Sequence, residues 1–517
     1  MRVSLKLTHR GYNALKCSNG NKLMFPTNFH DQVTTMRGYK RFSFVALATM
    51  IIIFSAGCGG NATNTPTPTG GFSNASINGA YAFSFSGNDA SGFFAVAGTL
   101  TANGSGQITS GVIDINRVGG VLQNIGLTGT YATRADGRGV ATLNTTAGNF
   151  SLAFSILNAN RVLITRFETG ANGSGAMELQ NPGAFSTAAL AGQFAFNLSG
   201  VDTAGNPFAT VGSVNTNAAG TVTGGIQDSS DDGAILQAAP ITAGTIAVAS
   251  NGRGTASLST ASGVLNFAFY VVDANQIKLV ETDVTPVLAG DAFRQNGTFS
   301  NATLTGPFAF TIGGANLAAP FAAGGVLTSN GAGAITSGTE DVNNGGTVTA
   351  NLTVSGTYTL AANGRGTALL ATGLGNVNLA FYPTTKGIQV LEADTGLIAN
   401  GAAFQQTGSL SSATVSGNYA MNFTGVSTTG ALDAVSQFNA NGAGALSGII
   451  DINNFGSLST GTSITGNYSV GADGRGPLTF ITALGQQNLA IYVVDSTHAI
   501  FIDLDSTIVT LGEMDHR

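Results

Sequence analysis

A short pattern, Asp/Asn-Gly-Arg-Gly, occurs four times in the chain at nearly equal spacing. Its arginines are Arg138, Arg253, Arg365 and Arg475, which lie 115, 112 and 110 residues apart. A repeat of about 110 residues can bury its own core, and it is far longer than a solenoid repeat of about 20 to 45 residues. The sequence therefore predicts four tandem copies of one domain.

Apolar and small polar residues alternate inside each repeat, which is the pattern of a β-strand. In the first repeat, Tyr81, Phe83 and Phe85 share one face of such a strand. Turn signals such as Asn103-Gly104 follow at intervals of about eight to twelve residues, so each repeat holds about eight short strands. No helical periodicity of useful length is present.

Eight sequential antiparallel strands with short connections can close into a barrel, which removes the exposed edges of the sheet. The expected fold class is therefore all-β, with four tandem antiparallel domains that form small up-and-down barrels. A two-sheet β-sandwich is the main alternative. The opening Gly79-Ala80-Tyr81 resembles the first strand of lipocalins. This resemblance implies a barrel architecture only.

The segment before the repeats combines a basic stretch, an uncharged apolar run and a cysteine. Residues 36–41 include three bases, and residues 42–57 carry no charge. That run is shorter than the roughly 20 residues of a spanning helix and fits the core of a signal peptide. It ends in Ser55-Ala56-Gly57-Cys58, which resembles the signal of bacterial lipoproteins. The resemblance implies a lipid on Cys58; an ordinary secretory signal or a buried apolar segment is the alternative.

These marks divide the chain into seven expected segments. Residues 1–35 are an extension or a mis-assigned start, 36–57 a signal peptide and 58–75 a flexible linker broken by Pro and Gly. The four β repeats are expected at 76–182, 186–296, 300–407 and 411–517. The joins between repeats are small and polar, so we expect some flexibility between neighbours. The lipid implies anchoring to a membrane in an extracytoplasmic place, at the outer membrane or the cell surface.

Two sets of ionisable residues recur with the repeat. Each arginine of the pattern is followed by an acid 27 to 30 residues later. We expect these two residues to pair within one repeat and to tie its fifth strand to its seventh, with ligand binding as the alternative. The expected pairs are Arg138 with Glu168, Arg253 with Glu281, Arg365 with Glu392, and Arg475 with Asp503. A second series, Asp114, Asp228, Asp341 and Asp451, is interpreted as capping turns rather than binding calcium.

The net charge and the positions of the histidines exclude several classes of function. Residues 58–517 hold 12 basic and 25 acidic residues, which disfavours nucleic acid as a partner. His498 and the penultimate His516 both belong to the fourth repeat, and the other repeats hold no histidine, so no repeated triad or zinc site can form. We therefore expect no enzyme activity, no metal and no cofactor. The expected function is adhesion, envelope or interaction with a surface protein or glycan; the alternative is carriage of small apolar ligands inside the barrels.

Overall fold

The computed structural model describes residues 71–317, 319–482 and 485–517. All of them belong to one compact unit, Thr63–Arg517, and a second unit comprises Met1–Ala62. The described chain is built from antiparallel strands and five short 3₁₀ helices. None of the helices described is long and apolar enough to cross a membrane. The predicted all-β class is confirmed.

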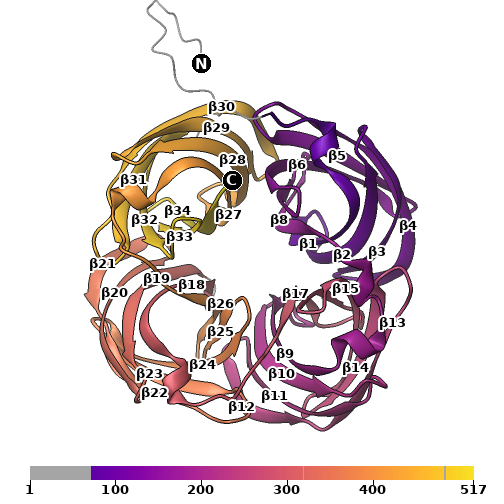
Figure 1. Cartoon of the computed structure of the whole chain (residues 1–517), viewed down its shortest axis with the longest axis horizontal. Helices are drawn as coiled ribbons and strands as arrows, with labels where there is room; N and C mark the ends of the chain where they lie inside the picture. The colour runs from indigo at the N-terminus through magenta and orange to yellow at the C-terminus, as the bar shows by residue number, and fades with distance from the viewer. Residues whose placement is uncertain (1–70, 318, 483–484) are drawn as a thin grey trace, which may run out of the picture. The chain divides into compact units, whose positions relative to one another are not determined.

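The strands form four modules in chain order (Figure 1). Module 1 is a closed barrel in which each strand pairs with the next and β8 returns to β1. Module 4 is closed in the same way. The strands of module 1 are β1 (Asn78–Asp89), β2 (Gly92–Asn103), β3 (Gln107–Arg117), β4 (Gly120–Thr133), β5 (Arg138–Thr145), β6 (Gly148–Asn158), β7 (Arg161–Arg166) and β8 (Ala171–Leu179). Those of module 4 are β27 (Ser416–Ser427), β28 (Gly430–Asn441), β29 (Ala445–Asn454), β30 (Ser457–Tyr468), β31 (Arg475–Thr482), β32 (Gly485–Val493), β33 (His498–Asp503) and β34 (Ile508–His516).

The fourth strand is divided in the two central modules. Module 3 still closes, because β20 pairs with both β19 and β22. Module 2 is an open, curled sheet of nine strands with β12 and β13 at its edges. The strands of module 2 are β9 (Gly192–Val201), β10 (Pro207–Thr216), β11 (Val222–Asp231), β12 (Ala234–Ile241), β13 (Ala243–Val248), β14 (Arg253–Thr260), β15 (Gly263–Asp273), β16 (Gln276–Glu281) and β17 (Val287–Arg294). Those of module 3 are β18 (Thr305–Asn316), β19 (Ala319–Asn330), β20 (Ala334–Asn344), β21 (Thr347–Thr353), β22 (Ser355–Leu360), β23 (Gly366–Thr372), β24 (Gly375–Thr384), β25 (Gly387–Glu392) and β26 (Leu397–Gln405).

Each module has its own apolar core inside the curved sheet. The inward face of β1 contributes Tyr81, Phe83 and Phe85, as the alternation predicts. Equivalent buried clusters fill the other three modules. The sheet of each module is continuous, so the sandwich alternative is wrong.

The modules also pack against one another through small apolar patches on their outer surfaces. Alanines of the first two strands of one module meet larger residues of the last strands of the next, as where Ala82 and Ala95 contact Tyr270 and Val280. Similar patches join module 2 to 3 and module 3 to 4. A fourth patch joins module 4 back to module 1, through Ala420 and Ala153 among others. The modules thus close a cycle of contacts. The composition of the joins gave no sign of these buried contacts between neighbouring modules.

Candidate functional site

The recurring Gly-Arg-Gly pattern forms the tight turn that leads into the fifth strand of each module. In module 3, the Asn363 side-chain oxygen accepts the Arg365 main-chain N–H at 3.1 Å. Gly364 has a φ of +83°, a conformation that glycine adopts without strain. Gly366 is needed for another reason: a Cβ there would lie 2.1 Å from the ring of Phe381. The turn therefore aims the Arg365 side chain away from its own barrel.

Each arginine binds the aspartate of the preceding module. Arg365 contacts both carboxylate oxygens of Asp228, with Nη2–Oδ1 at 2.5 Å and Nε–Oδ2 at 2.8 Å. The Tyr382 hydroxyl donates to Asp228 Oδ2 at 2.6 Å. The side chain of Asp228 is fully buried. The same arrangement joins Arg253 and Tyr270 to Asp114, and Arg475 and Tyr492 to Asp341.

The expected pairing within a repeat is therefore corrected: the arginine partner lies in the neighbouring module. Glu281, Glu392 and Asp503 end the seventh strands and are buried. The Glu281 carboxyl group accepts from the Asn116 amide of module 1, and those of Glu392 and Asp503 accept the main-chain N–H groups of Asp394 and Asp505. Glu168 lies two residues beyond the position in module 1 that is equivalent to these three acids. Arg166 takes their place, because Arg166 pairs across β6 as Glu281 pairs across β15. Glu168 binds Arg166 at 2.5 Å and accepts the Ser151 N–H.

The second series of aspartates has a double role. Asp228 Oδ1 also accepts the main-chain N–H of Ala238, a residue with a φ of +53° where the fourth strand bulges. Asp114, Asp341 and Asp451 hold the equivalent bulges at Asn124, Asn351 and Gly461. The capping interpretation is therefore corrected: each aspartate does satisfy a main-chain donor, but at a bulge of the fourth strand rather than in a turn. Both series recur at the repeat spacing, which made these aspartates candidate partners of the arginines but did not distinguish them from the acids of the seventh strands.

The junction between module 4 and module 1 closes the cycle with different residues. Arg138 Nη1 lies 2.8 Å from both oxygens of Asp451, and Nε binds Asp136 at 3.1 Å. Ser155 stands where the other junctions have tyrosine, and its hydroxyl accepts from Gln437 at 2.9 Å. Arg517 then binds Gln437 at 2.8 Å. Its position matches that of Gln180, Gln295 and Gln406, which end the other modules and bind the next one.

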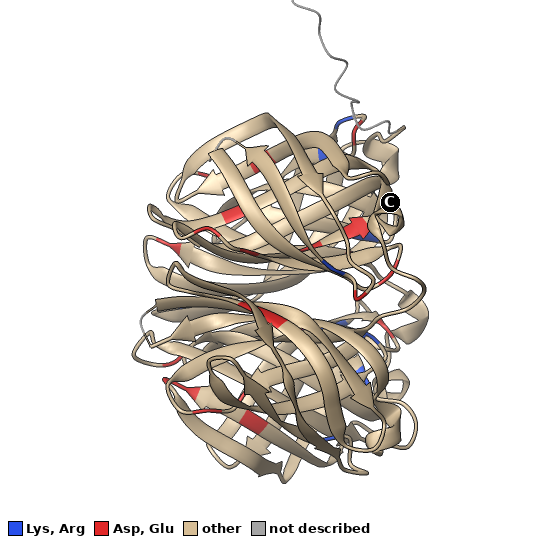
Figure 2. Ribbon diagram, turned by 90° about the vertical axis from the view of Figure 1, so that its left-hand side faces the viewer, with Lys and Arg blue, Asp and Glu red and all other residues tan. Residues whose placement is uncertain are grey.

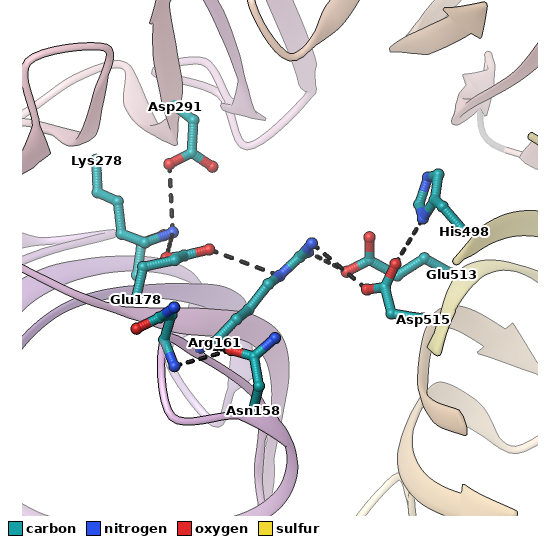
Figure 3. Close-up of polar contacts among 10 residues, drawn as sticks. Asn158, Arg161, Glu178, Lys278, Asp291, His498, Glu513 and Asp515 are labelled. Atoms are coloured by element: carbon teal, nitrogen blue, oxygen red, sulfur yellow. Dashed lines mark hydrogen bonds and ion pairs between the residues drawn. The ribbon is translucent and has the colours of Figure 1, made fainter. Parts of the chain in front are cut away.

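A charged cluster joins three modules through their seventh and eighth strands (Figure 3). Arg161 of module 1 lies 2.6 Å from Glu513 and 3.4 Å from Asp515, both of module 4. Lys278 of module 2 lies 2.8 Å from Glu178 of module 1. Burial lowers the pKa of Lys278, but the carboxylates of Asp291 and Glu178 outweigh this and raise the pKa overall. The lysine is therefore charged and binds the two modules together.

His498 extends this cluster and raises the question of a metal. The side-chain donors of His498, Glu513 and Asp515 lie within 4.8 Å of one another. Arg161 already occupies the space beside both carboxylates, and the His498 Nδ1 is 2.6 Å from Asp515. Burial lowers the pKa of His498, yet the bond to Asp515 outweighs it and raises the pKa. The Arg161 guanidinium thus lies where a cation would bind these two carboxylates, and the residues of the cluster form an ion-pair network.

No protein-family model and no curated protein matches this chain. The fold and the junctions define it structurally as a cycle of four antiparallel β-modules joined by buried Arg–Asp pairs. The predicted signal peptide and Cys58 lie outside the described residues.

Proposed function

We propose that this protein is a lipid-anchored, extracytoplasmic scaffold that presents one face of its module cycle to a surface protein or glycan. The observation that carries the proposal is the way the repeated ionisable residues are used. The arginines of the Gly-Arg-Gly turns bind neighbouring modules, and the charged cluster adds ion pairs between modules 1, 2 and 4. Ion pairs that hold the modules at fixed positions are suited to a protein that makes several contacts with a partner at once.

The two faces of the cycle differ, which supports presentation of one of them. We call distal the side of the β1–β2 turn and its equivalents, and proximal the side where β1 begins and the chain ends. Lys and Arg gather toward the proximal side (Figure 2). In the described residues, the large apolar side chains exposed within hairpin turns are all distal: Val118, Val284, Leu317, Leu374 and Phe455. These side chains are available for apolar contact with a partner on the distal face.

Two experiments test this proposal. Mass analysis of the mature N-terminus should find a diacylglycerol adduct on Cys58, and Cys58→Ala should move the protein from the membrane fraction to the soluble one. An unchanged distribution would contradict the anchor. For the distal face, the full chain with Cys58→Ala should sediment with envelope fragments of its own host. Adding Phe455→Ser and Leu317→Ser should abolish sedimentation, while Lys386→Ser on the proximal side should not.

The alternative function, carriage of apolar ligands in every barrel, has less support. Buried side chains such as Phe83, Tyr131 and Phe154 occupy the interior of module 1, and the interiors of modules 3 and 4 are occupied likewise. A carrier requires a lumen of about 300 Å³ or more for a drug-sized ligand.

A further inference from the structure

Three modules share a tyrosine that seals the proximal end of the core. Tyr131, Tyr358 and Tyr468 each stand seven residues before the arginine of the turn. The Tyr358 hydroxyl donates to the carbonyl oxygens of Leu304 and Asn301, both at 2.9 Å. The Tyr131 hydroxyl makes the same pair of contacts, and the Tyr468 hydroxyl donates to Val415. The ring therefore fills the core while the hydroxyl fastens the 3₁₀ segment that covers the barrel end.

Module 2 has Ile246 at this position. The equivalence is fixed by the backbone, because Ile246 N–H binds Gly220 O as Tyr358 N–H binds Gly333 O. An isoleucine is smaller than tyrosine and cannot reach the covering segment Thr187–Leu190 with a hydrogen bond. The Thr216 hydroxyl donates to Leu190 O at 2.9 Å, as the equivalent Ser329 donates to Leu304 O in module 3 beside Tyr358. Module 2 thus keeps one hydrogen bond to its covering segment, whereas the volume of the tyrosine ring is not replaced.

A cavity of about 60 Å³ lies in the core of module 2, beside Ile246. Its walls are apolar, and they include Phe196, Leu258 and Phe269. Thr216, the one lining residue with a polar side chain, already donates to Leu190 O. An apolar cavity without free hydrogen-bonding groups excludes water and accepts apolar ligands.

The open sheet of module 2 offers an entrance to this cavity. β12 (ending at Ile241) and β13 (beginning at Ala243) do not pair with each other, and they form the two edges of the sheet. The seam between β11 and β13 is crossed by the Ile246 N–H to Gly220 O bond and a bridge between Thr221 and Thr245. A seam held by so few bonds opens at less cost than a continuous ladder.

We propose that module 2 contains a binding site for a small nonpolar molecule, which occupies the space that the tyrosine ring fills in the other modules. A dry cavity of about 150 Å³ can hold benzene, so the cavity of module 2, of about 60 Å³, suits a smaller guest, such as xenon or a hydrocarbon of one or two carbon atoms. Binding would bury apolar surface and require no hydrogen bond. This site is independent of the scaffold function proposed above.

Xenon is the probe that tests the site, because it is nonpolar and small. With the purified full chain, increasing xenon pressure should shift the methyl resonances of Ile277 and Ala292, which line the cavity, in a saturable manner. Ile246→Tyr should abolish this shift and raise the denaturation midpoint. A linear shift in the wild type, or an equal saturable shift in Ile246→Tyr, would overturn the proposal.

The repeats supply a matched control. Tyr358→Ile should create a second saturable response in module 3, near Leu304 and Leu370, while leaving that of module 2 unchanged. Because Ile246→Tyr can fail to fold, Ala256→Val gives a second way to fill the cavity and should likewise abolish the response of Ile277.

Discussion

At the scale of single residues, the junctions are buried charge pairs whose partners depend strongly on each other. Asp228 is fully buried, and it accepts from Arg365, from Tyr382 and from the Ala238 main chain. Taking such a carboxylate out of water is costly unless every oxygen finds a partner. The pair therefore fixes which modules adjoin, and the loss of one member leaves the other uncompensated.

We predict that Arg365→Ala will lower the free energy of unfolding by about 3 to 5 kcal/mol, because it leaves Asp228 buried without its cation. Arg365→Lys should restore only part of this, since an ammonium cannot bind both oxygens as the guanidinium fork does. Denaturant titration of the full chain measures the effect. Lys386→Ala, at an exposed site, is the control, and equal midpoints for the two alanine variants would refute the prediction.

The acids that end the seventh strands make stability depend on pH. Burial, with a contribution from Asp394, raises the pKa of Glu392 to about 9. From about pH 4.5 to pH 9 the folded chain therefore holds a proton that the unfolded chain releases. The free energy of unfolding falls as pH rises through this window, by up to about 1.4 kcal/mol per pH unit.

Glu392→Gln should remove this penalty, because the amide is neutral and still offers an oxygen to the Asp394 N–H. We expect the variant to be more stable than the wild type at pH 8 and nearly equal at pH 4. Denaturation curves at both pH values measure this. Equal pH profiles for the two proteins would show that Glu392 is ionised in the folded state.

At the scale of structural elements, the turn before the fifth strand depends on close packing as much as on backbone freedom. Gly366 carries no unusual φ, yet the edge of Phe381 lies where its Cβ would be. The second glycine of the pattern thus lets an aromatic ring of the sixth strand cover the start of the fifth. Gly139 and Gly254 are covered in the same way by Phe154 and Phe269.

Gly366→Ala should therefore cost about 1 to 3 kcal/mol of unfolding free energy, the usual range for overpacking. Gly126→Ala is the matched control, since Gly126 also lies in a strand and nothing stands within 4 Å of its Cβ position. We expect this control to be neutral or slightly stabilising. Thermal denaturation compares the two, and a neutral Gly366→Ala would contradict the packing argument.

At the scale of the whole compact unit, the modules contact one another in a cycle. We therefore expect the stability of the unit to depend on which modules are in contact more than on their order along the chain. Arg517 contacts Asp136 and packs on the ring of Phe72 at 4.5 Å, so the start and end of the described chain meet at the same junction. The apolar patch between modules 4 and 1 is equivalent to the three patches between sequence neighbours.

A circular permutant cut after Gly408, with the original ends joined by a flexible linker, should fold with a midpoint close to that of the parent, because it retains all four junctions. Deleting residues 409–517 should instead expose two apolar patches and the buried Asp341, and we expect aggregation. Size-exclusion chromatography and denaturation of both proteins measure this. A well-folded, monomeric deletion variant would show that the modules are independent.

Much of the fold could be predicted from the sequence, because it depends on local patterns. The Gly-Arg-Gly spacing gave four modules, and the alternation around Phe83 gave inward and outward faces of strands. The ion pairs of the candidate site were harder to predict. Arg365 and Glu392 were matched because they recur at one spacing, but so do Arg365 and Asp228, and spacing alone does not say which acid an arginine meets.

The sequence by itself determined that the chain repeats an antiparallel β-unit, since turn residues and period-two alternation act over a few neighbouring positions. Tertiary structure decided which module each arginine binds, that the fourth module returns to the first, and that Ile246 leaves a cavity where tyrosine fills the other cores. These outcomes depend on surfaces that meet only after each sheet has curled, so no local pattern encodes them.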